Sequence, residues 1–235
     1  MIAITFALPA ESSDFVRLLA NPVVRAPEGV KGIRGQIHGR EVEVFHTGVG
    51  EKRCRAQVEN FLRRQQFKYL ISAGFAGALD QKLEVGDLLL SENFSSPELL
   101  ASAHLDFAGA GIFLGKLATV PGIVDSLSER DRWAAESGAA AVDMETEFIA
   151  AACAAQRIPM LSLRAISDTP SKPFPAPPNV LFDLEKQKTN FGRLAVYLMT
   201  HPGAALRLNA FRQRVALARQ MLTSALEELL RVDLI

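Results

Sequence analysis

Acidic side chains follow short apolar runs at three separate places in this sequence. Glu11 comes after the run 2–7, Glu145 follows 140–143, and Asp168 follows 159–166. Carboxyl groups serve enzymes as general acids and general bases, because burial and neighbouring charges can adjust their pKa values for either role. A fourth polar cluster, the glycine-rich segment 74–77, also ends an apolar run, and we expect it to be a loop. If the four runs are strands of one sheet, the sequence predicts acid–base chemistry where they end.

The apolar runs alternate with stretches of helical periodicity. The predicted strands cover 2–7, 36–38, 41–46, 69–73, 113–120, 140–143 and 159–166, and a further strand begins at 85–87. One predicted helix begins near residue 11, and the others cover 51 to about 66, 128–137 and 146–156. This order predicts one α/β domain with three layers, α/β/α, around a central mixed and mostly parallel sheet. Ligands bind such sheets at the carboxyl ends of the strands, which is where the polar clusters lie.

Other segments carry less regular patterns. The alternation of Glu41 and Glu43 with valines predicts a half-exposed strand. No element is assigned to 92–111. Five prolines predict a loop over 170–183 beside the site, and C-terminal helices are expected over 184–235. The first of these helices carries apolar residues at helical spacing over 191–199. The second, after Pro202, carries Phe211, Val215, Ala218, Leu222 and Leu229.

Composition narrows the partners. The 235 residues are 49% hydrophobic, and 26 basic residues balance 26 acidic ones, so no overall field would attract nucleic acid and a small-molecule partner is expected. The start of the chain has no basic region of a signal peptide, no run reaches the length of a membrane span, and the two cysteines suit a reduced cytoplasmic protein. The four histidines are scattered without ligand spacing, so we expect no metal ion.

Four segments together carry a resemblance to a known family. They are the opening strand with ALPAE, SAGFAGAL followed by LEVGDLLLS, AVDMETEFIAAAC, and LRAISD, in this order from residue 1 to about 169. They resemble the nucleoside phosphorylase family, which includes purine nucleoside phosphorylases and methylthioadenosine/S-adenosylhomocysteine nucleosidases. The resemblance implies cleavage of the N-glycosidic bond of an adenosine-type nucleoside. Such a cleavage develops positive charge on the sugar and negative charge on the departing base.

The resemblance also implies roles for individual residues. Asp168 would be the general acid that protonates N7 of the purine, and Ser167 would orient it. Glu145 would accept hydrogen bonds from the ribose hydroxyls, and Met144 would pack against the sugar. Glu11 would activate the attacking water, as in the hydrolytic branch of the family. Structural explanations stand beside each role: an aspartate at a turn, acids in the first turn of a helix, and a thioether in the core.

The reaction type depends on which groups are missing. Phosphorolytic relatives hold phosphate with arginines near the segments that align with ALPAE and ISAGF, and these segments contain none. Phosphate without a cationic clamp is poorly held, so hydrolysis without a cofactor is favoured. A phosphate-dependent phosphorylase remains the alternative, with phosphate as its co-substrate. A non-catalytic nucleoside-binding protein is a further alternative.

Two substitutions depart from the nucleosidase pattern. Phe75 stands where many relatives carry a small hydroxyl residue, and Ile123 stands in 120–124, where an aromatic residue is expected beside adenine. With Gly77 and Ser167 these residues form the predicted base pocket, which they make more apolar. The stretch between Ser91 and Phe113 is short, which suggests an open 5′ side. Together with the C-terminal extension this is similar to the hopanoid-associated phosphorylase branch, so the substrate can carry a large apolar 5′ substituent.

The predicted C-terminal helix is basic and amphipathic. Arg207, Arg212, Arg214 and Arg219 occur with no acid between them, a pattern that suits weak contact with an anionic membrane surface. The alternative is a helix packed onto the domain or against a second subunit. The apolar helices lead us to expect a homodimer.

Overall fold

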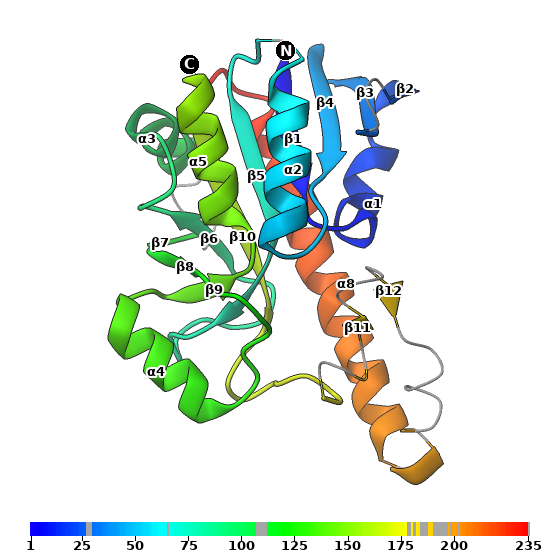
Figure 1. Cartoon of the computed structure of the whole chain (residues 1–235). Coiled ribbons are helices and arrows are strands. Elements are labelled where there is room, and N and C mark those ends of the chain that lie inside the picture. The colour runs from blue at the N-terminus through cyan, green and yellow to red at the C-terminus, as the bar shows by residue number, and fades with distance from the viewer. Residues whose placement is uncertain are drawn as a thin grey trace.

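A ten-stranded mixed sheet runs through the centre of the computed structural model (Figure 1). The structure describes residues 1–26, 30–64, 66–106, 112–177, 180, 182–183, 188–189, 197, 199–201 and 203–234. The strand order is β2-β3-β4-β1-β5-β10-β6-β7, and β9 joins β5 and β8 beside this path. The strands are β1 (Ile2–Phe6), β2 (Ala20–Arg25), β3 (Gly32–Ile37), β4 (Arg40–His46), β5 (Leu70–Ala78), β6 (Leu88–Ser91), β7 (Ile112–Gly115), β8 (Leu117–Thr119), β9 (Ala141–Asp143) and β10 (Met160–Asp168), with a separate pair β11 (Phe182–Asp183) and β12 (Lys188–Thr189).

Helices cover both faces of this sheet. One face packs against α1 (Pro9–Arg17), α3 (Pro97–Asp106) and α8 (Ala204–Leu229), and the other against α2 (Glu51–Leu62) and α5 (Thr146–Gln156). The helix α4 (Leu127–Ser137) lies beyond β8 and β9 (Figure 1). The predicted three-layer α/β/α architecture with a mixed sheet is therefore confirmed.

The central strands are mostly apolar because both faces are covered. In β1, Ile2, Ile4 and Phe6 join the core under α1 and α8, whereas Ala3 joins the core under α2 and α5. The second core contains the stacked rings of Phe45 and Phe61, whose centroids are 3.7 Å apart. Because β1, β5 and β10 are parallel neighbours, their carboxyl ends lie at one edge of the sheet, as predicted.

The glycine-rich segment 74–77 is part of a strand, contrary to the loop that we predicted. Strand β5 continues to Ala78 because β10 runs beside it, with Arg164 opposite Gly74 and Asp168 opposite Gly77. The neighbouring strand supplies the hydrogen bonds that a loop would have left to solvent. Two other predictions for strands were imprecise: β6 begins at Leu88 after the turn at Gly86, whose φ is 96°, and the predicted strand 113–120 is divided into β7 and β8.

Three further expectations need correction. Strand β4 is not half-exposed: Glu43 is buried and pairs with Arg34 at 3.1 Å, so its charge is met inside the protein. The stretch 92–111 contains the helix α3. Helix α2 ends at Leu62, earlier than the predicted end near residue 66.

The C-terminal region ends in one long helix, α8. Its second half packs on the sheet through residues that include Ala218, Leu222 and Leu229, whereas Phe211 and Val215 in its first half are only partly buried. The first half extends beyond the sheet (Figure 1). The predicted helix over 191–199 lies mostly outside the described residues. Among the helices that the structure describes, none has the length and apolar character needed to cross a bilayer.

Candidate active site

A small cavity lies at the carboxyl edge of the sheet, between the ends of the central strands and the start of α5. Measured for the centre of a water-sized sphere it has a volume of about 10 Å³, which is room for one water molecule. Two of the predicted acids, Glu11 and Glu145, both line it. The lining residues are Thr5, Phe6, Ala7, Glu11, Thr47, Ala73, Gly74, Phe75, Glu145, Ile149 and Arg164.

Glu11 is fixed at this cavity by the start of α1. The helix begins at Pro9, and Oε2 of Glu11 turns back to accept hydrogen bonds from the backbone N–H groups of Ala7, at 2.8 Å, and Leu8, at 3.0 Å. Burial raises the pKa of Glu11 above its ordinary value, although these N–H groups and the nearby Arg164 act in the opposite direction. A carboxylate with a raised pKa is a stronger base, so this group can accept a proton from water.

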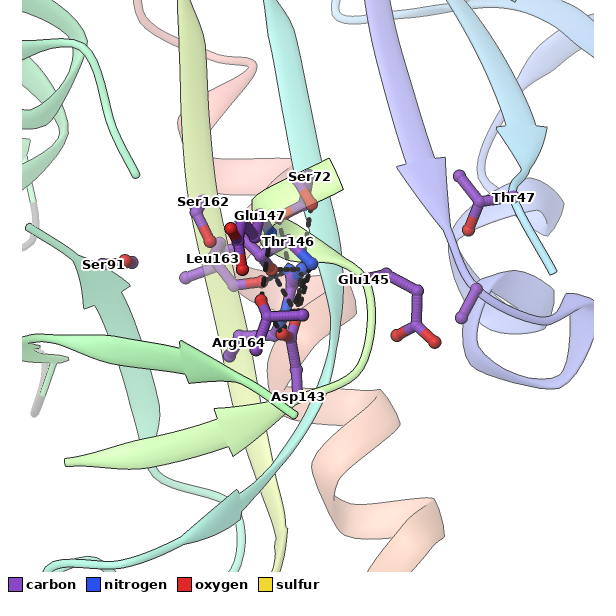
Figure 2. Close-up of polar contacts among 12 residues, drawn as sticks. Thr47, Ser72, Ser91, Asp143, Glu145, Thr146, Glu147, Ser162, Leu163 and Arg164 are labelled. Carbon is purple, nitrogen blue, oxygen red and sulfur yellow. Dashed lines mark hydrogen bonds and ion pairs between the residues drawn. The ribbon is translucent and has the colours of Figure 1, made fainter. Parts of the chain in front are cut away.

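Glu145 reaches the cavity from the opposite side. It precedes the first turn of α5, and its Oε1 accepts the backbone N–H of Gly50 at 2.9 Å. Figure 2 shows its side chain pointing away from Arg164 and Asp143. Burial raises the pKa of Glu145 to about 8, and the charges of Asp143 and Glu11 act in the same direction, so Glu145 can keep its proton near neutral pH.

Asp143 does not line the cavity but anchors a buried arginine (Figure 2). Its Oδ2 accepts both Nε of Arg164, at 3.1 Å, and Nη2, at 3.0 Å. Arg164 also donates to the carbonyl oxygens of Ser72 and Leu163 and to the hydroxyls of Ser72 and Thr146. Every N–H of this guanidinium therefore has an acceptor within the protein.

Asp168 lies at the end of β10, where a bulge interrupts its register with β5. Its Oδ1 accepts the hydroxyl of Ser167 at 2.7 Å, and its Oδ2 accepts Nη2 of Arg130 at 2.5 Å. Burial raises the pKa of Asp168, while Arg130 and Ser167 lower it. A carboxyl group with a raised pKa keeps its proton closer to neutral pH, which a general acid requires.

Asp168 does not line the cavity, but both Asp168 and Glu11 lie against strand β5. A Cβ placed on Gly74 would lie 3.8 Å from Oε2 of Glu11, and a Cβ placed on Gly77 would lie 2.9 Å from Oδ2 of Asp168. Gly74 and Gly77 are three residues apart on one strand, roughly 10 Å. Glu11 and Asp168 therefore contact β5 at points roughly 10 Å apart along the strand, and because positions three apart face opposite sides of a pleated strand, the two contacts are on opposite faces of β5.

The remaining predicted residues divide into two groups. Phe75 lines the cavity, while Gly77 and Ser167 contact or adjoin Asp168. Met144 and Ile123 do not line the cavity. Met144 packs against the apolar cluster that contains Val120, Val124 and Val142, so its packing is that of a core thioether. Ile123 lies partly buried ahead of α4.

Two buried arginines were not assigned a role from the sequence. Arg164 stands between leucine and alanine in a buried strand, and a charge in that context indicates a paired arginine, so the sequence did contain a sign of it. Arg130 stands among charged residues of α4, where nothing distinguishes it from a solvent-exposed side chain. Within the described part of the chain, no group of three or more His, Cys, Asp or Glu side chains is placed to hold a metal ion.

Fold and site together define an α/β protein in which Glu11 and Glu145 line a small cavity at the carboxyl edge of the sheet. The family model of the phosphorylase superfamily matches residues 1–109 and 94–199, so the chain belongs to this superfamily. The resemblance stated above is confirmed.

Individual relatives agree with this membership. A 5′-methylthioadenosine/S-adenosylhomocysteine nucleosidase of Staphylococcus saprophyticus is 25% identical over 202 residues, which cover 72% of this chain and 86% of the relative. The structure of such a nucleosidase from S. pneumoniae with the transition-state inhibitor MT-ImmA has a TM-score of 0.75 at 20% identity and covers 98% of both chains. That of the Colwellia psychrerythraea nucleosidase with adenine has a TM-score of 0.74 at 18% identity, covering 97% of this chain and 93% of the other.

Proposed function

We propose that this chain is a nucleosidase that hydrolyses the N-glycosidic bond of an adenosine-type nucleoside without a cofactor. The observation that carries the proposal is that Glu11 and Glu145 line one small cavity, with Asp168 at the end of β10, opposite Gly77 of β5. Relatives named as nucleosidases, one of them solved with adenine, support the substrate class.

Each acid then has a distinct task. Glu11 accepts a proton from the water as its oxygen attacks C1′ of the ribose. Glu145 accepts hydrogen bonds from the ribose hydroxyls, with Met144 as a packing neighbour. Asp168 gives its proton to N7 as the electron pair of the glycosidic bond moves onto the purine. The products are the free base and the free sugar, and the proton from water restores the acid in the next cycle.

The state of Arg164 supports hydrolysis over phosphorolysis. Arg164 is the only arginine among the described residues that line the cavity. All of its N–H groups already donate to Asp143, Ser72, Leu163 and Thr146. A phosphate in the cavity would lack a cationic clamp. A phosphorylase would need a cation from elsewhere.

The short stretch between Ser91 and Phe113 and the C-terminal extension motivate the finer proposal of a substrate with a large apolar 5′ substituent. We test it by comparing adenosine with 5′-alkylthio derivatives of increasing chain length. Rising kcat/KM with chain length supports the proposal. A preference for the smallest substituent contradicts it.

Assembly and location are also proposed. The exposed Phe113 and Leu114 on the edge strand β7 are candidates for a homodimer contact, which light scattering would detect. Two free, buried cysteines suit a cytoplasmic protein. For weak membrane contact, the exposed Leu206 on the projecting half of α8 is the place to test, by sedimentation with anionic vesicles.

Most of the basic face of α8 is used inside the protein. Arg219 pairs with Asp14 at 2.7 Å, and Arg214 and Arg207 donate to backbone carbonyls of the Pro-rich loop. Of the four arginines that suggested a membrane surface, Arg212 alone has no hydrogen bond or ion pair to the described residues. Any attraction to lipid is therefore expected to be small.

The deciding experiment measures adenine release from 5′-methylthioadenosine and adenosine with and without phosphate, and identifies the sugar product. Free sugar formed without phosphate is expected. Strict dependence on phosphate would establish the phosphorylase alternative. Saturable binding without turnover at any pH would establish a non-catalytic binder. In variants, Glu145→Ala should lose binding, whereas Asp168→Asn should keep binding and lose cleavage.

A further inference from the structure

Helix α4 is docked through an unusual side chain. Its one fully buried residue is Arg130, which is 1% exposed, and the apolar neighbours Trp133 and Ala134 are only partly buried. Burying a cation is costly unless acceptors surround it. Nη1 of Arg130 donates to the carbonyl oxygen of Ala78 at 2.7 Å, and Nη2 donates to Asp168. Among the described residues, Nε has no hydrogen-bond acceptor.

This arrangement is poorly suited to stability alone. Apolar residues of similar volume often stabilise a protein as well as a buried ion pair does. Arg130 also buries an Nε that has no acceptor among the described residues. The guanidinium instead lies against the carboxyl group that the proposed function makes the proton donor.

We propose that Arg130 is a positioning residue for Asp168: it makes Oδ2 the ionic side of the carboxyl group and leaves Oδ1 as the oxygen that carries the catalytic proton. A guanidinium has donors only, so a proton on Oδ2 would meet an N–H of Arg130 at 2.5 Å. Oδ1 faces the hydroxyl of Ser167, which can both donate and accept. The inference rests on the proposed function.

Ser167 fits this assignment because its hydroxyl has two acceptors within reach. It can donate to Oδ1 of Asp168 at 2.7 Å or to the carbonyl oxygen of Ala76 at 3.4 Å. When Oδ1 carries the proton, the hydroxyl donates to Ala76. When the O–H bond of Asp168 breaks and the N–H bond at N7 forms, the hydroxyl turns to Oδ1 and Arg130 neutralises the new carboxylate.

The charges around Asp168 define what the pH dependence must show. Arg130 from α4 and Arg214 from α8 both lower its pKa, while burial raises it, and Gly77 of β5 contributes no side chain. Removing Arg130 should therefore raise the pKa of Asp168. The acid form would persist to higher pH, but it would be a weaker acid that leaves an uncompensated carboxylate.

The test compares Arg130→Gln and Arg130→Lys with Arg132→Gln, the same change at an exposed position of α4. In Arg130→Gln we expect kcat to fall roughly 10–100-fold and the alkaline limb of kcat/KM to move up by about one pH unit or more. Arg130→Lys keeps a charge and should return the limb toward that of the wild type. Arg132→Gln should change neither.

Carbon-13 NMR of the Asp168 carboxyl group supplies a readout that does not need catalysis. Its titration should move to higher pH in Arg130→Gln, and a titration that stays at the wild-type pH overturns the inference. If Arg130→Gln does not fold, Arg130→Met decides, because it fills the buried volume without a charge, and an unchanged kcat and titration in that variant would also overturn the inference. A wild-type protein that releases no purine refutes the proposed function, while the NMR comparison still tests Arg130.

Discussion

The raised pKa of Glu145 makes a prediction about stability that needs no substrate. A carboxyl group whose pKa rises from 4.5 to about 8 on folding binds its proton more tightly in the folded state. Ionisation therefore favours the unfolded chain, and the stability of the protein falls as the pH rises from 4.5 toward 8. Glu145→Gln keeps the size of the side chain and an oxygen for the N–H of Gly50, but it does not titrate.

The magnitude follows from linkage between proton binding and folding. Between pH 5 and pH 7 the wild type should lose roughly 2–3 kcal/mol relative to Glu145→Gln. For a chain of this size that corresponds to roughly 5–10 °C in the relative melting temperature. Thermal unfolding of both proteins across this range measures the difference, and substrate should be left out because it would stabilise the folded wild type.

The control is Glu147→Gln, a change at an exposed glutamate two residues along the same helix. Its melting curve should run parallel to that of the wild type. If the curves of Glu145→Gln and the wild type also stay parallel between pH 5 and pH 7, then folding does not raise the pKa of Glu145 as its burial implies. Above about pH 8, where Glu145 is ionised, the same variant should bind nucleoside more weakly than the wild type, because an amide cannot accept from both ribose hydroxyls as a carboxylate can.

Two further predictions concern close packing and thiol chemistry. Gly77→Ala places a Cβ 2.9 Å from Oδ2 of Asp168 and should reduce the rate of purine release roughly a hundredfold. Gly74→Ala, where the nearest atom is 3.8 Å away, should retain most of the activity. Equal effects of the two substitutions in a kinetic assay would count against this geometry. Burial raises the pKa of Cys153 to about 12 and also raises the pKa of Cys54. Neither thiol should therefore react with a disulfide reagent at pH 8 until guanidinium unfolds the protein. Rapid reaction of the native protein would contradict this prediction.

The layers of the fold were predictable because periodicity is a local property. The run 2–7 is apolar at every position except Thr5, as expected for a strand covered on both faces, and α5 was predicted with its exact bounds. The prediction that Glu43 is exposed was wrong because its burial depends on a contact between strands. Its partner Arg34 lies on another strand, and alternation within one strand carries no information about such a pair.

The glycine-rich segment 74–77 shows the same limit at the site. Glycines favour loops when judged alone, and only the presence of β10 beside them makes the segment a strand. The acids Glu11 and Glu145 were found because each follows a predicted strand. Arg130 could not be found, since a helix of mostly charged residues gives no indication of which one turns inward.

Two buried arginine–aspartate pairs distinguish structure from chemistry at this edge of the sheet. Asp143 and Asp168 have the same side chain, each at the end of a strand, and each pairs with an arginine. Asp143 also accepts from the hydroxyl of Thr119 and from both the backbone and the hydroxyl of Thr146, so all of its acceptor positions are used.

Asp168, by contrast, accepts from one hydroxyl and one guanidinium nitrogen of the described residues, which leaves lone pairs for a proton. A fully used carboxylate can only hold its neighbours in place. One with a free lone pair can gain and lose a proton without breaking its ion pair. The number of donors around each acid, rather than the acid's position in the sequence, therefore separates the anchor of Arg164 from the proposed proton donor.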